Sequence, residues 1–250
     1  MIKEGSINQL RQFIKLKEVP FSVVFEITNQ CDLQCVHCYQ ENKKKKELTL
    51  NEIKLILDDL ANIGTMKLTL TGGEPFLRED FVEIYQYCIQ KRFATTLFTN
   101  ATLISPEHKK ILLKNPPWAV ECSLYGATAN THELITGVNG VFEGTLSNIK
   151  WMVSKGIRVI IKSIILSLNF NDLNALAQLC DKLGITFYPS FRVYPSADPN
   201  RSVKKLRIAT ADFKKLLKKN NWLLKRYRGE LYSGNQSNGF ICNAGREACC

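Results

Sequence analysis

Strand-like and helix-like segments alternate along most of this 250-residue chain. Short runs rich in β-branched and aromatic residues are each followed by a segment in which apolar residues have helical spacing. The strand candidates are residues 21–28, 66–71, 95–99, 118–124, 157–166 and 185–191, and the helix candidates are residues 50–63, 80–91, 141–155, 172–183, 210–224 and a helix opening at Ser105. This alternation predicts an α/β fold with a parallel sheet covered by helices.

The number of repeats limits the architecture further. Six units end near residue 224, whereas a closed barrel of eight units usually takes ~250 residues for the barrel alone. We therefore expect a partial, TIM-like (β/α)6 barrel of parallel strands. A doubly wound open sheet is the alternative, although no glycine-rich dinucleotide turn follows the first strand. In both folds, reactive groups belong beyond the carboxyl ends of the strands.

Other features exclude several classes of protein. No stretch approaches the ~18 apolar residues of a membrane span, and the amino terminus lacks the apolar core of a secretion signal, so we expect a cytoplasmic protein. An odd number of cysteines, nine, argues against a disulfide framework. Cys88, Cys122 and Cys180 lie singly in apolar stretches and are expected to be buried.

The net charge of +11 is concentrated in one segment. Residues 201–228 contain eleven Lys and Arg residues and a single acid, Asp212, while the rest of the chain is nearly neutral. This concentration of positive charge has two interpretations. It indicates either binding of an anionic partner, such as an acidic peptide or nucleic acid, or a helix face that is exposed to solvent and binds nothing. No aromatic or motif pattern of nucleic-acid binding accompanies the charge.

Three cysteines follow the first strand candidate directly. Cys31, Cys35 and Cys38 are close enough in sequence to converge on one metal centre. A zinc site usually has four ligands in two pairs, and no second pair follows within ~20 residues. His37 would have to complete such a site, but it is adjacent to Cys38. A [4Fe-4S] cluster with three cysteine ligands and one open iron fits better, and structural zinc is the alternative.

A second motif, Gly72-Gly73-Glu74-Pro75, ends the second strand candidate. Glycines allow a ligand to approach the backbone closely, and carbonyls together with a carboxylate suit an ammonium group. Both motifs should therefore lie at the same edge of the sheet.

Together the two motifs resemble those of the radical SAM enzymes, in which Cys-x3-Cys-x2-Cys follows the first barrel strand. The resemblance implies a [4Fe-4S] cluster on Cys31, Cys35 and Cys38, and S-adenosylmethionine (SAM) with its amino group at the Gly-Gly-Glu-Pro motif. It also implies that Ala101 and Tyr125 replace a more usual glycine and aspartate. The implied SAM contacts are Tyr39, Gly72, Gly73, Glu74, Pro75, Asn100, Ser123 and Lys162.

The resemblance implies a chemistry as well. Such enzymes cleave SAM reductively to a 5′-deoxyadenosyl radical, which abstracts hydrogen from a substrate; the cofactors carry this chemistry, and no further catalytic residue is assigned. An electron donor of the flavodoxin or ferredoxin type is implied as a partner.

The last residues carry a third resemblance. Cys242-x-Ala-Gly-Arg is similar to the opening of the SPASM extension, a cysteine-rich domain with auxiliary clusters that is common in peptide and protein maturases. Because further cysteines of that domain are absent, we expect a truncated extension and at most a vestigial cluster at Cys242. The expected organisation is a lead-in over residues 1–19, the barrel over residues 20–224, and a linker with the start of the extension over residues 225–250.

These features predict a radical SAM enzyme acting in peptide or protein maturation, with an acidic leader peptide bound by the basic segment. Two alternatives stay open. One is the same chemistry on RNA or on a small metabolite such as a cofactor precursor. The other is a non-catalytic remnant of such an enzyme.

Overall fold

Six strands form one parallel sheet in the computed structural model, which describes residues 19–40, 46–197 and 202–223. Each strand pairs with the next one along the chain, so the sheet order follows the sequence. Its edges are β1 and β6. The strands are β1 (Ser22–Thr28), β2 (Lys67–Gly72), β3 (Ala94–Thr99), β4 (Ala119–Ser123), β5 (Val159–Ile164) and β6 (Thr186–Ser190).

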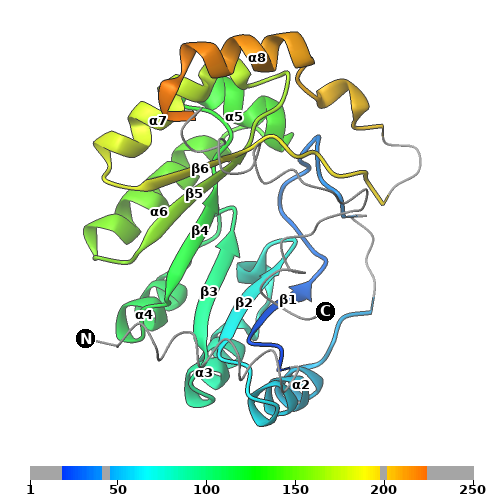
Figure 1. Ribbon diagram of the computed structural model, residues 1–250. Helices are drawn as coiled ribbons and strands as arrows, with labels where there is room; N and C mark the ends of the chain where they lie inside the picture. The colour runs from blue at the N-terminus through cyan, green and yellow to red at the C-terminus, as the bar shows by residue number, and fades with distance from the viewer. Residues whose placement is uncertain (1–18, 41–45, 198–201, 224–250) are drawn as a thin grey trace, which may run out of the picture.

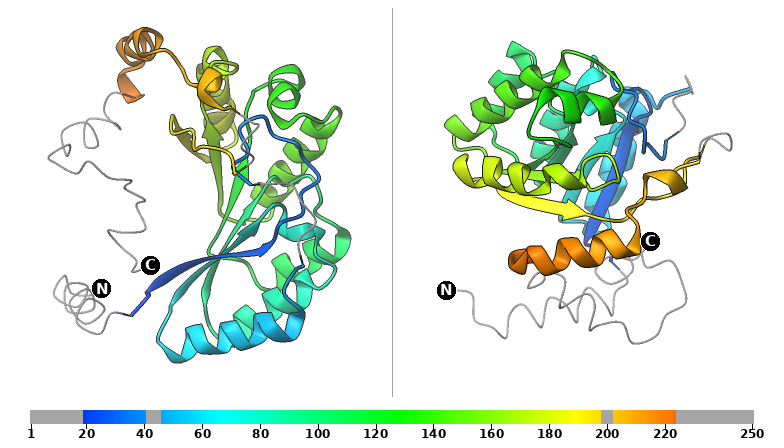
Figure 2. Two further views of the ribbon diagram at one scale, coloured as in Figure 1. Left: turned by 90° about the vertical axis from the view of Figure 1, so that its right-hand side faces the viewer. Right: turned by 90° about the horizontal axis from the view of Figure 1, so that it is seen from above.

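The helices that connect the strands cover the convex face of this curved sheet, as Figures 1 and 2 show. Right-handed crossovers between consecutive strands place every connecting helix on the same side when the strand order never reverses. The helices are α2 (Leu50–Asn62), α3 (Phe81–Gln90), α4 (Pro106–Lys114), α5 (Ala129–Thr136), α6 (Val141–Ser154), α7 (Leu173–Lys182) and α8 (Thr210–Lys219), with short 3-10 helices η1 (Pro75–Leu77), η2 (Phe170–Asp172) and η3 (Lys204–Leu206). The partial (β/α)6 barrel is thereby confirmed, and the doubly wound alternative, which needs a reversal of strand order, is wrong.

The two faces of the sheet differ in polarity. Side chains toward the helices, such as Leu70, Val120 and Ile161, are completely buried and form the core. The opposite, concave face carries polar and charged groups, among them Glu121 and Lys162, which form an ion pair across β4 and β5. The expected buried cysteines, Cys88, Cys122 and Cys180, are all 0% exposed.

Most elements begin and end within a few residues of their predicted bounds, but the sequence pattern missed α5. Thr128 caps this helix by accepting a hydrogen bond from the backbone N–H of Thr131, and Gly137 ends it with a left-handed φ of 72°. These two residues were the available signals, because an eight-residue helix gives too few apolar repeats for a periodicity.

The proposed lead-in, apart from Val19, and the proposed extension with Cys242 lie outside the described residues. In the parts of the chain that the structure describes, no helix combines the length and apolar character needed to span a membrane.

Candidate functional site

The three clustered cysteines lie on the loop after β1, at the carboxyl edge of the sheet. All three face one pocket, which is lined by Asn29, Cys31, Leu33, Gln34, Cys35, Cys38 and Gln40. Within the described ranges, no three His, Cys, Asp or Glu side chains are grouped so as to hold a metal ion. The thiols instead surround a shared space, which matches the donor set of a multi-iron cluster.

Burial keeps two of these thiols, those of Cys31 and Cys35, protonated when no cation is near. It raises the pKa of Cys31 and of Cys35 to about 12, and the neighbouring cysteines add to this effect by charge repulsion. A bound metal reverses that balance, because its positive charge stabilises the thiolate form. The residues present therefore fit a metal cluster: three soft ligands are held in one pocket with no fixed cation among its lining residues.

The end of β2 holds the first part of this loop. The backbone N–H of Gly73 donates to the Thr28 carbonyl (2.9 Å), and that of Glu74 donates to the Gln30 carbonyl (2.8 Å). A β-carbon on Gly73 would lie 2.1 Å from the Gln30 oxygen, and one on Gly72 would lie 2.3 Å from the Thr28 oxygen. Both glycines are thus required for close contact between the two motifs, and Gly72 also has a φ of 151°.

Glu74 lies within the protein rather than at the pocket. Its carboxylate is 0% exposed and accepts hydrogen bonds from the Thr99 hydroxyl, the Asn100 backbone N–H and the Phe76 backbone N–H. Burial raises its pKa to about 7, and the hydrogen bonds oppose that rise. The side chain that was expected to meet an ammonium group thus joins the ends of β2 and β3.

Asn100, at the end of β3, contacts the cysteine loop directly. Its amide nitrogen lies 2.7 Å from the Asp32 carboxylate and 3.9 Å from the sulfur of Cys31. The Thr102 hydroxyl donates to the other oxygen of Asp32. Asp32 and Thr102 were not predicted as site residues, since nothing in their spacing distinguishes them from ordinary loop residues.

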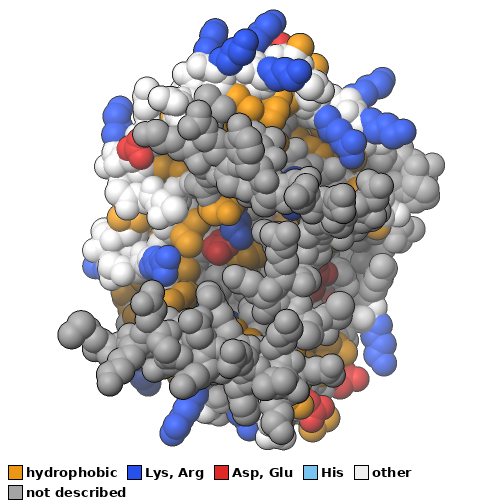
Figure 3. Space-filling view, in the orientation of Figure 1, with side chains coloured by type: hydrophobic (Ala, Val, Ile, Leu, Met, Phe, Trp, Pro, Cys, Tyr) orange, Lys and Arg blue, Asp and Glu red, His pale blue; other side chains and the backbone are white. Residues whose placement is uncertain are grey.

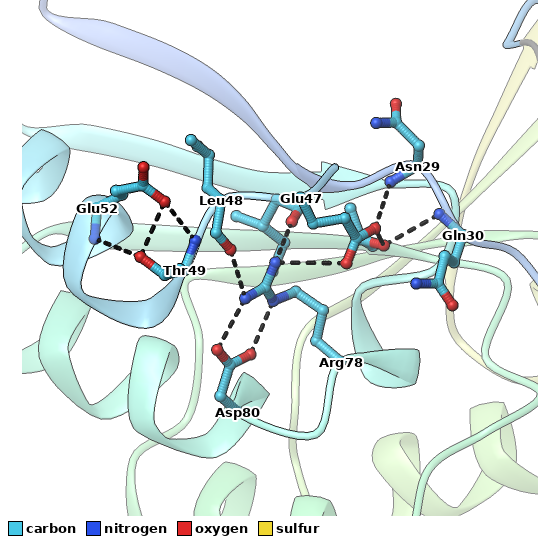
Figure 4. Close-up of polar contacts among 10 residues, drawn as sticks. Asn29, Gln30, Glu47, Leu48, Thr49, Glu52, Arg78 and Asp80 are labelled. Carbon is cyan, nitrogen blue, oxygen red and sulfur yellow. Dashed lines mark hydrogen bonds and ion pairs between the residues drawn. The ribbon is translucent and has the colours of Figure 1, made fainter. Parts of the chain in front are cut away.

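A charged network, also missed, supports the base of the loop (Figure 4). Glu47 accepts from the Thr28 hydroxyl and the Asn29 backbone N–H, and it pairs with Arg78 at 3.6 Å. The guanidinium of Arg78 also makes two 2.7 Å contacts to Asp80 and donates to the Ile27 carbonyl. Such a fork of planar donors can fix two carboxylates and a backbone segment at once.

The unpredicted helix α5 holds the opposite side of the loop. The backbone N–H groups of Gln34 and Val36 donate to the carbonyls of Thr136 and Ile135, both at 2.9 Å. A β-carbon on Gly137 would approach the Gln34 oxygen to 2.7 Å. The cysteine loop is therefore anchored by β2, β3 and α5 together.

The remaining predicted residues lie around the concave face. The Tyr39 hydroxyl donates to Glu26 of β1, and this ring is 49% exposed. Ser123 and Lys162 are register partners on β4 and β5. The Lys162 ammonium pairs with Glu121 and lies 4.3 Å from the centre of the Phe98 ring. The structure brings Ser123 and Lys162 together, but none of the residues named here lines the cysteine pocket.

Comparison with known proteins agrees with this geometry. The family model described as the radical SAM superfamily matches residues 25–183, which include the second half of β1, all of β2 to β5 and both motifs. The chain belongs to the radical SAM superfamily. Its curated relatives carry the names of synthases and maturases.

Three curated relatives of this radical SAM chain illustrate the range of activities for which the relatives are named. An AdoMet-dependent heme synthase of Methanosarcina barkeri is 30% identical over 82% of this chain and 58% of its own length. An Fe-coproporphyrin III synthase of the same organism is 33% identical over 70% of this chain and 44% of its own length. The mycofactocin maturase MftC of Mycobacterium tuberculosis is 30% identical over 71% of this chain and 46% of its own length. The chain thus spans about half the length of these relatives.

Solved structures support the fold. Streptococcus suis SuiB bound to S-adenosylmethionine superposes with a TM-score of 0.72 at 19% identity, over 90% of this chain and 53% of SuiB. SuiB bound to precursor peptide SuiA gives a TM-score of 0.68 over 90% of this chain and 51% of SuiB. At this identity the likeness concerns the fold alone.

Proposed function

We propose that this chain is a radical SAM enzyme that holds a [4Fe-4S] cluster on Cys31, Cys35 and Cys38 and acts on a peptide or protein. When bound, such a cluster supplies one electron to SAM, which yields methionine and a 5′-deoxyadenosyl radical able to take a hydrogen atom from a substrate. One observation carries the proposal. Three cysteines line one pocket whose loop is fixed by β2, β3 and α5.

Residues beyond the cysteine pocket have distinct tasks in the proposal. The backbone of Gly72 and Gly73 receives the SAM ammonium, because the Glu74 carboxylate is already occupied by internal donors. The cation of Lys162 binds the SAM carboxylate, and Ser123 contacts the ribose or the carboxylate. The half-exposed ring of Tyr39 packs against the adenine.

The test is made anaerobically on reconstituted protein. We expect about four irons per chain and slow formation of 5′-deoxyadenosine from SAM under dithionite. Cys35→Ala should abolish both. Cys88→Ala is the matched control, since Cys88 is buried in α3 away from the pocket, and it should retain both. Wild-type protein without iron would refute the proposal, and about eight irons would indicate a second cluster on residues outside the described ranges.

The peptide substrate is supported by the relatives named as peptide cyclase and maturase, and by the peptide-bound SuiB structure. The exposed Lys and Arg residues of η3, α8 and the segment between them would receive an acidic part of that peptide. An electron donor of the flavodoxin or ferredoxin type completes the set of proposed partners, and a cytoplasmic location would suit such a cluster.

A small metabolite is the second candidate substrate, because the heme and coproporphyrin synthases match this chain over 82% and 70% of its length. The two substrates are distinguished by which one accelerates 5′-deoxyadenosine formation. Stimulation by an iron porphyrin and none by acidic precursor peptides would overturn the peptide proposal.

A further inference from the structure

We propose that Asn100 is a positioning residue whose side-chain amide donates a hydrogen bond to the Cys31 sulfur and thereby raises the reduction potential of the bound cluster. The inference rests on the proposed function in one respect, namely that Cys31 is a cluster ligand. It assigns to this side chain a task different from direct contact with SAM.

The contact lies in a protected position. Asn100 is 7% exposed, and its Nδ2 lies 3.9 Å from the Cys31 Sγ, within reach of a long hydrogen bond to the large sulfur atom. The same nitrogen donates to Asp32 at 2.7 Å, so its two hydrogens serve two neighbouring acceptors. A second donor, the backbone N–H of Leu33, reaches the same sulfur at 3.5 Å.

The orientation of the Asn100 amide is determined by Thr102. The backbone N–H of Thr102 donates to Asn100 Oδ1 at 2.9 Å, and the Thr102 hydroxyl lies 2.6 Å from the same oxygen. A backbone N–H can only donate, so it requires the amide oxygen on its side. The NH2 group must therefore face Cys31 and Asp32. This network selects one of the two amide orientations and points the donor at the sulfur.

Such a donor acts on the redox equilibrium. A cluster gains negative charge when it takes up an electron, so an N–H dipole directed at a ligand sulfur stabilises the reduced form more than the oxidised form. Hydrogen bonds to the sulfurs are one of the known determinants of cluster potential. Loss of this donor should shift the midpoint potential to a more negative value. We expect about a fivefold change in the reduction equilibrium, or about 40 mV at 59 mV per tenfold for one electron.

The experiment is an EPR-monitored redox titration of the reconstituted full chain, without SAM. Asn100→Leu removes the donor and keeps a side chain of similar size, and it should shift the midpoint negatively with iron content unchanged. Should this variant hold less iron, Asn100→Ser carries the same expected shift. Serine keeps an oxygen acceptor near the Thr102 N–H but is too short to reach Cys31.

Asn148→Leu is the matched control. The Asn148 amide, on α6, donates to the carbonyl of Ala101 at 2.9 Å, so it supports the same turn without contacting the cysteine loop. A purely structural role for Asn100 predicts equal midpoints in wild type and all variants, and that result would overturn the inference while the proposed function stands. Wild-type protein that binds no iron would refute both.

Discussion

At the scale of single residues, Glu74 is a completely buried carboxylic acid, although its charged form is normally stabilised by water. Its carboxylate lies where β2 and β3 end, and three donors from Thr99, Asn100 and Phe76 converge on it. Burial disfavours the charged form, which is why the pKa rises from 4.5 to about 7. Glu74 therefore connects the ends of β2 and β3, and its raised pKa makes the free energy of unfolding depend on pH.

This raised pKa predicts a pH-dependent stability. The folded chain binds a proton at Glu74 that the unfolded chain has already released between pH 4.5 and 7, so the contribution is present below 4.5 and lost as pH rises through about 7. The loss amounts to about 3 kcal/mol, at about 1.4 kcal/mol per pH unit. Urea unfolding followed by tryptophan fluorescence at pH 5 and pH 8 should show this decrease in wild type but not in Glu74→Gln.

Glu79→Gln is the control, because Glu79 is exposed and should leave the pH dependence as in wild type. Equal pH dependence in wild type and Glu74→Gln would contradict the assignment.

At the scale of elements, the glycines that end β2 determine how the cysteine loop docks. Gly73→Ala would force a β-carbon to within 2.1 Å of the Gln30 backbone oxygen, so the loop must move away from β2. We expect a loss of stability of about 2 kcal/mol or more and iron content well below that of wild type. Iron analysis after reconstitution and thermal unfolding of the same samples measure both effects.

Gly144→Ala provides the matched substitution. Gly144 lies within α6, and a β-carbon there meets nothing within 4 Å. Alanine should therefore stabilise the helix by about 0.5–1 kcal/mol and leave iron content unchanged. Equal iron in both variants would show that the close approach at Gly73 is not needed for cluster binding.

The sequence was sufficient to predict the elements with a clear period and the motifs with fixed spacing. Residues 157–166 form a nearly continuous apolar run, and Ser105 precedes a proline, so β5 and α4 followed from local chemistry. Arg78 and Glu47 could not be predicted as partners, because they lie 31 positions apart and meet only once β1 and β2 pair. The same holds for Asp32 with Thr102, whose contact depends on the end of β3 reaching the cysteine loop.

At the scale of the whole molecule, positive charge is concentrated at one end. Figure 3 shows Lys and Arg side chains gathered over α8. The exposed basic residues of η3, α8 and the segment between them are Lys204, Lys205, Arg207, Lys214, Lys215, Lys218 and Lys219. The apolar side of α8 packs through Leu217 against Ile165 and Leu173. The orientation of α8 is therefore fixed, and its charged side stays available to a partner.

Reversal of four of these charges tests the acidic-peptide proposal. Lys214, Lys215, Lys218 and Lys219 changed together to Glu should weaken binding of a fluorescent poly-glutamate peptide at least tenfold at low salt, and added salt should reduce the difference. Fluorescence anisotropy measures the affinity.

The control variant changes Lys110, Lys114, Lys150 and Lys155 to Glu, which alters net charge equally on exposed positions of α4 and α6 and just after α6. Equal weakening of peptide binding by both variants would show that the effect comes from the net charge of the protein and not from a binding surface on α8. Tighter, strongly salt-dependent binding of single-stranded RNA would favour the nucleic-acid alternative instead.

The anchors of the cysteine loop also bear on the order of events during synthesis. Each strand pairs with its immediate predecessor, so the sheet can grow as the chain leaves the ribosome. The loop itself, at residues 29–38, depends on Gly73, then on Asn100, and finally on Ile135 and Thr136, about a hundred residues later. Its pocket is complete only after α5 has emerged. If the loop holds the proposed cluster, iron enters it as a late step, set by the last anchor rather than by the cysteines themselves.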